Sequence, residues 1–176
     1  MSETSHLAEA LEGLLATTNY SWFVSYPTAV DGLTAEQAAC AIGPRLNSIW
    51  GIILHLSMSQ QFALAVLRGD TIDMSTITVD GIWPSIIDPQ DEEAWQKAKF
   101  DLLNVNHALA EYVAGLPAEA LEQQLPLVEM KCYAYIQGIL AHNKYHLCEI
   151  VDMRHMQGLW LLEKNLDEAD QSVERG

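Results

Sequence analysis

Four long stretches of this chain repeat their apolar residues with the spacing of an α-helix, and proline or glycine ends each of them. The pattern predicts helices over residues 5–26, 44–68, 89–114 and 133–157, and the predicted stop signals are Pro27, Gly69, Gly115 and Gly158. No convincing set of strands accompanies these helices. The sequence therefore predicts an all-α fold, a four-helix bundle.

Two of the predicted connections are long. Residues 70–90 contain glycine, proline and β-branched residues and predict an ordered loop, and a connection of about 20 residues in a compact domain is often functional. Residues 116–131 form the second long connection, which we expect to be partly extended. A short helix is predicted from Thr34, because its spacing to Gln37 is that of a capping box.

The length of 176 residues fits one domain, and we assign residues 1–162 to the bundle and residues 163–176 to a polar tail. The helix predicted over 44–68 is apolar nearly all round, and such a helix is buried on most sides. We therefore expect a homodimer that buries this helix, with Ile53 as an outward position. The first helix is the alternative interface.

Charge and cysteine content exclude several classes of protein. Nine Lys and Arg against 24 Asp and Glu give a net charge of −15, which repels nucleic acid and anionic membranes. The three cysteines, Cys40, Cys132 and Cys148, include no C-x-x-C pair and do not predict a disulfide framework. No signal peptide and no apolar run of about 18 residues is visible, so a cytoplasmic protein is expected.

Histidines in two of the predicted helices carry the strongest chemical signal. His142 and His146 are four residues apart, so their rings share one face of the last helix. That face also carries other residues: Tyr135, Ile139, Glu149 and Met153. His55 lies on an apolar stripe near the middle of the second helix, at a matching depth whichever way the two helices run. Together the three predict a site for one divalent metal ion.

A lone histidine on an apolar face is more often a core residue than a ligand, but three inward histidines need partners for all their ring nitrogens. The other histidines, His6, His107 and His155, do not share these faces.

Glu149 follows His146 by one turn, and its carboxylate has three open roles: metal ligand, hydrogen-bond partner of a ligand imidazole, or proton-transfer group. Partial exposure without a role is the alternative. Cys148 points away from that face, and we expect its side chain to be a buried structural thiol.

The segments 47–56, 138–150 and 153–158 resemble the DinB/YfiT-like superfamily of small metal-binding bundles. The resemblance spans most of the chain and implies metal ligation by His55, His142 and His146. The family often continues its last histidine with Arg, Gly and Gln, whereas this chain has Leu147, Cys148 and Glu149.

The resemblance and the three histidines suggest a metal-dependent transferase or isomerase that uses a low-molecular-weight thiol. The ion is expected to be Zn, Ni or Fe, one per chain, in a pocket lined by Tyr135, Glu149, Met153 and part of 70–90. A hydrolase on the same site is the close alternative. The other alternative is a non-catalytic dimeric stress or binding protein whose metal is structural or vestigial.

Overall fold

The computed structural model describes residues 2–15, 24–44 and 46–160, and it confirms the all-α fold. The helices of the described part are α1 (Glu3–Glu12), α2 (Tyr26–Val30), α3 (Ala35–Ala39), α4 (Ile49–Arg68), α5 (Val79–Ile82), α6 (Glu92–Ala114) and α7 (Cys132–Met156). Two short 3-10 helices, η1 (Met74–Thr76) and η2 (Ala118–Glu122), lie in the connections. The tail predicted over 163–176 lies outside the described residues.

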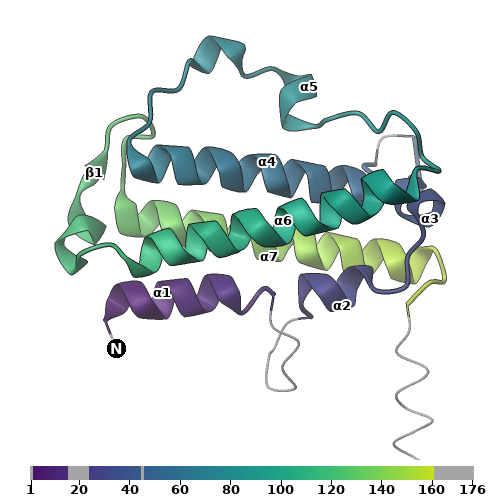
Figure 1. Cartoon of the computed structure of the whole chain (residues 1–176), viewed down its shortest axis with the longest axis horizontal. Coiled ribbons are helices and arrows are strands. Elements are labelled where there is room, and N and C mark those ends of the chain that lie inside the picture. Colours follow the sequence, from purple (N-terminus) through teal and green to yellow (C-terminus); the bar gives the residue numbers. More distant parts are fainter. Residues whose placement is uncertain (1, 16–23, 45, 161–176) are drawn as a thin grey trace, which may run out of the picture.

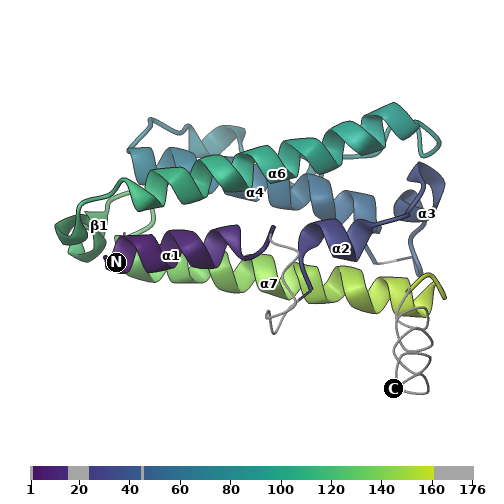
Figure 2. The same cartoon turned by 60° about the horizontal axis from the view of Figure 1, so that its bottom comes forward.

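The bundle has four rows of helix (Figures 1 and 2). Helices α4, α6 and α7 form three rows, and α1 and α2 follow one another along the fourth. Trp50 and Trp95, near the starts of α4 and α6, bring their rings to 5.6 Å, and Tyr112 near the end of α6 donates a hydrogen bond to the carbonyl of Leu67 near the end of α4. Helices α4 and α6 are therefore parallel.

This topology accounts for the length of the connection between α4 and α6. Two consecutive parallel helices require the chain to return along the whole bundle, and residues 70–90, which we call the strap, do so over α4 (Figure 1). The strap contains η1 and α5 and is thus ordered, as the sequence predicts. The second long connection, 116–131, contains η2 and a hairpin of β1 (Gln124–Leu125) and β2 (Met130–Lys131), so it is partly extended, as expected.

The prediction of one continuous helix over 5–26 is wrong. Helix α1 ends at Glu12 with Gly13 as its C-cap, and a new helix begins after Ser25, whose hydroxyl accepts a hydrogen bond from the N–H of Thr28. Pro27 belongs to the first turn of α2, where its missing N–H leaves no hydrogen bond unmade. Residues 16–23 of the predicted helix lie outside the described residues.

Helix α4 begins five residues later than predicted. Ser48 caps it by accepting a hydrogen bond from the N–H of Gly51, and Pro44 belongs to the preceding turn. Its predicted end is confirmed, because Gly69 adopts φ 75° and its N–H bonds back to the last turn. The capping box of Thr34 and Gln37 at the start of α3 is also confirmed.

A layer of buried polar residues divides the core into two apolar clusters. Within α4, α6 and α7, the buried apolar residues of one cluster lie in 49–56, 95–105 and 147–153, and those of the other lie in 64–67, 109–113 and 132–140. The polar residues between them are Ser57, Gln60, Asn106 and Asn143. The histidines lie beside this layer, at the junction of the two clusters.

Other elements of the same chain cover most of helix α4. Ile53, expected to point outward, is 1% exposed and belongs to the first cluster, so that expectation is wrong. By length and composition alone α4 could cross a membrane, but more than half of it is buried in the bundle. Intrachain packing accounts for its all-round apolar surface, which removes the reason for placing a dimer interface there.

Candidate metal centre

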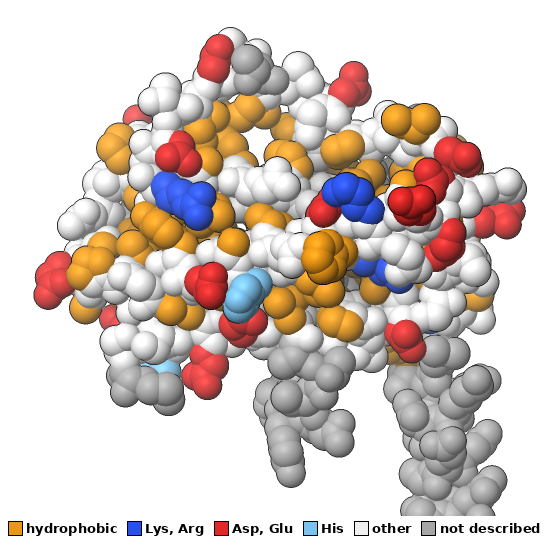
Figure 3. Space-filling view, viewed as in Figure 1, with side chains coloured by type: hydrophobic (Ala, Val, Ile, Leu, Met, Phe, Trp, Pro, Cys, Tyr) orange, Lys and Arg blue, Asp and Glu red, His pale blue; other side chains and the backbone are white. Residues whose placement is uncertain are grey.

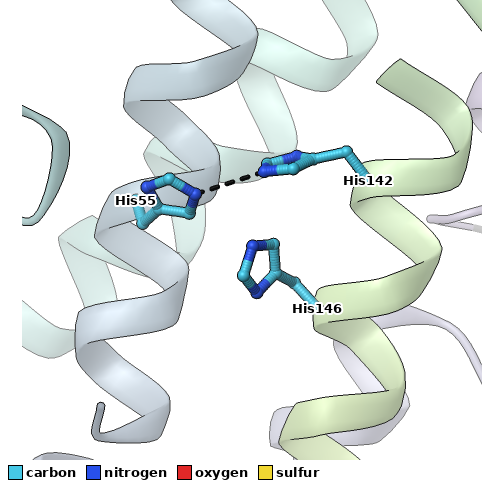
Figure 4. Close-up of side chains that lie close together, drawn as sticks. All are labelled: His55, His142 and His146. Carbon is cyan, nitrogen blue, oxygen red and sulfur yellow. Dashed lines mark hydrogen bonds between the residues drawn. The ribbon is translucent and has the colours of Figure 1, made fainter. Parts of the chain in front are cut away.

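His55 from α4 and His142 and His146 from α7 point their rings toward one another (Figure 4). One ring nitrogen from each lies within 4.8 Å of the others. Met58 and Phe62 follow His55 along α4, whereas Tyr135 and Ile139 precede His142 along α7, and all four line the same groove. The two helices are therefore antiparallel. This orientation, which the sequence left open, brings together the three histidines it predicted.

Hydrogen bonds fix the proton positions on two of these rings. His55 donates from Nδ1 to the carbonyl oxygen of Ile82 at 2.8 Å, because that oxygen can only accept. His146 donates from Nδ1 to the Glu149 carboxylate, also at 2.8 Å. In the neutral form of each ring, the lone pair of His55 and of His146 is then on Nε2, where it is available to a cation.

The third ring completes the donor set. The Nε2 atoms of His142 and His55 are 3.2 Å apart. Burial lowers the pKa of both rings and so favours their neutral forms. Neutral imidazoles with converging nitrogens are the donors that zinc, nickel and iron accept, so the residues present fit a divalent ion.

The strap closes one side of this centre. The ring of Trp83 stacks on His55 with centroids 3.9 Å apart and planes within 10°, and it also meets the edge of His146. The strap thus supplies two contacts to His55, a carbonyl acceptor and an aromatic face. Trp83 was not among the site residues predicted from the sequence. Its place between Gly81 and Pro84, inside a long connection, was the available signal.

Family comparison agrees with this geometry. The family model described as the DinB superfamily matches residues 25–150, a range that includes all three histidines. The chain belongs to the DinB superfamily. No curated protein and no solved structure matches the chain.

In this DinB-superfamily chain, Glu149 takes one of the roles the sequence left open. Its carboxylate is the hydrogen-bond partner of His146, and within the described residues the cluster that could hold an ion contains the three histidines alone. A three-nitrogen set leaves coordination positions open, whereas structural zinc is usually closed by four protein ligands.

A groove of about 500 Å³ adjoins the centre, with His142 in its wall. It lies between α4 and α7 and meets the strap at Met74, Ile77 and Ile82. Tyr135 lines it as expected, and burial raises the pKa of Tyr135 to about 12, so its hydroxyl stays protonated. Glu149 and Met153 do not line it. They belong to a separate groove of about 480 Å³ beside Cys148, so that part of the predicted pocket is wrong.

The remaining predicted residues lie elsewhere. Cys148 is exposed, so the buried structural thiol expected from its wheel angle is wrong. His107 pairs with Glu12 on the surface, and His155 lies against Trp160. These histidines do not join the metal centre, as expected.

Proposed function

We propose that this DinB-superfamily protein is a metal-dependent enzyme that acts on a small molecule. One divalent ion would be held by Nε2 of His55, Nε2 of His146 and a ring nitrogen of His142. The supporting observation is the open three-histidine set beside a groove large enough for a drug-sized ligand. An ion there would act as a Lewis acid and lower the pKa of a water or thiol beside it.

The protein's own residues supply positioning and shielding. Glu149 holds His146 in one tautomer, and the Ile82 carbonyl does the same for His55. Trp83 covers the His55 ring and limits access of water from the strap side. Tyr135 keeps its proton at neutral pH and can donate a hydrogen bond to a substrate in the groove.

Two nucleophiles fit this arrangement. A low-molecular-weight thiol gives the transferase or isomerase that the family resemblance suggests, and water gives a hydrolase. None of the described residues lining the groove is Asp, Glu, Lys or Arg. Most small cellular thiols carry carboxylates that such a lining leaves unpaired, so the groove favours water or an uncharged thiol.

Cobalt substitution separates these alternatives. The Co(II) protein should show a visible spectrum that changes when a nucleophile or substrate enters the coordination shell. A sulfur-to-metal charge-transfer band on addition of thiols, with turnover of thiol and electrophile pairs, supports the transferase. Turnover of apolar esters or amides without a thiol supports the hydrolase. Stoichiometric cobalt that responds to no thiol, ester or amide contradicts an enzymatic role and favours a non-catalytic metal protein.

We also propose that the protein is cytoplasmic and assembles as a homodimer. Several large apolar side chains stay exposed in the described part, including Phe100 on α6 and Tyr145 on α7. Light scattering at micromolar concentration tests the assembly, and a monomer mass contradicts it.

A further inference from the structure

The groove beside the histidines is lined mainly by flexible and aromatic apolar side chains. Three methionines contribute to its walls, Met58 from α4, Met74 from the strap and Met130 from β2, together with the Phe62 ring and Ile139. Methionine side chains are flexible and polarizable and adapt to ligands of varied shape. The lining is mostly apolar and contains no Asp, Glu, Lys or Arg, so it favours a ligand with an apolar surface.

One position in the wall is held open by a glycine. Gly138 lies inside α7, where glycine costs about 1 kcal/mol relative to alanine. A Cβ built at this position meets nothing within 4 Å, so no backbone crowding requires glycine here. Gly138 lines the groove, and the space above it belongs to the groove. The helix therefore carries a destabilising residue at the point where a side chain would narrow the cavity.

The groove is continuous with the metal centre on one side and covered by the strap on another. His142 is part of its wall, and the Ser59 hydroxyl, also in the wall, lies 3.5 Å from Nε2 of His55. In the space-filling view, hydrophobic side chains gather beneath the strap (Figure 3). A ligand in the groove would thus extend from the histidines along an apolar channel.

We propose that the substrate is an uncharged, largely apolar small molecule whose single polar head reaches the three histidines while its aliphatic or aromatic body fills the groove. This inference rests on the proposed function for the role of the head group. The preference for an apolar body rests on the groove alone. The two parts can be tested separately.

The groove is tested first in metal-free protein with N-phenyl-1-naphthylamine, a neutral dye whose fluorescence rises in apolar surroundings. Wild-type protein should bind the dye. Gly138→Phe should lose at least about tenfold in affinity, since the new ring fills the groove, while helix stability is kept or raised. Gly138→Ala is the matched control and should bind nearly as wild type. Equal dye binding by all three proteins, or none by any, overturns the apolar-body inference.

The head group is tested in zinc-loaded protein with straight-chain hydroxamic acids, whose head binds divalent metals. Affinity should rise about fourfold for each added methylene until the groove is full. The chain of the same length that ends in a carboxylate should bind at least about tenfold more weakly than its methyl-ended counterpart. No dependence on chain length in protein that binds zinc overturns the inference and leaves the proposed metal function standing. Dye binding that Gly138→Phe abolishes, in a protein that binds no metal, upholds the apolar groove and contradicts the proposed function.

Discussion

The Nε2 atoms of His55 and His142 lie 3.2 Å apart, although 87 positions of sequence separate the two residues. Because His55 gives its only proton to the Ile82 carbonyl, its Nε2 faces His142 with a lone pair. Without a cation, the contact requires His142 to donate a proton from Nε2. A bound cation would be held by the lone pairs of both nitrogens. The same contact therefore suits a metal-free and a metal-bound state with little rearrangement.

Metal stoichiometry tests this centre directly. Purified protein should carry close to one divalent ion per chain, and His142→Ala or His146→Ala should largely abolish binding, because each removes one of three donors. His107→Ala is the matched control, since His107 is an exposed histidine paired with Glu12. Elemental analysis after dialysis measures the outcome. Full metal content in both triad variants would contradict the assignment.

Glu149 should act through His146. Glu149→Ala should weaken metal affinity by about 10–100-fold, because the imidazole loses the acceptor that fixes its tautomer. Glu149→Gln should lose less, since an amide oxygen can still accept from Nδ1. Asp152→Ala, an exposed carboxylate on the same helix, is the control. Complete loss of metal in Glu149→Gln would instead identify Glu149 as a ligand.

The parts of this site that were predictable are those that helix geometry fixes locally. The spacing of His142 and His146 places their rings on one face, and the matching depth of His55 allows the three to meet. Trp83 and the Ile82 carbonyl were not predictable in this way, because they reach His55 only through the parallel order of α4 and α6. That order depends on packing between helices distant in sequence.

Errors at element ends have local causes. Pro27 predicts the end of a helix, yet proline is equally suited to the first turn of one, and Ser25 before it is the cap signal. Ile53 and Cys148 were misplaced for another reason. A helical wheel gives direction around one helix, whereas burial depends on which neighbours cover each side.

Ile53 gives a stability test of the corrected core. Ile53→Asp should destabilise the protein by more than about 3 kcal/mol, because it places a carboxylate without a partner among apolar side chains. Ile87→Asp is the control: Ile87 is 99% exposed in the strap, so its change should stay within about 0.5 kcal/mol. Urea unfolding of metal-free protein measures both. Similar losses in the two variants would place Ile53 outside the core.

The pair formed by His107 of α6 and Glu12 of α1 predicts a pH dependence separate from the metal centre. His107 Nδ1 lies 2.7 Å from the Glu12 carboxylate, and this hydrogen bond, together with attraction to Glu12 and Glu111, raises the pKa of His107. The folded state thus holds the proton more tightly than the unfolded chain, whose histidine pKa is about 6.5. The stabilisation is fully present below about pH 6.5 and is lost as pH rises through the raised pKa.

The stability difference between wild type and His107→Ala should therefore be larger near pH 6 than near pH 9, and small throughout because the pair is exposed. Chelator in every sample removes metal binding from the comparison, and any contribution of the metal-centre histidines is common to both proteins and cancels in the difference. A difference that stays constant from pH 6 to 9, measured by urea unfolding, would show that the contact between α1 and α6 does not depend on the charge of His107.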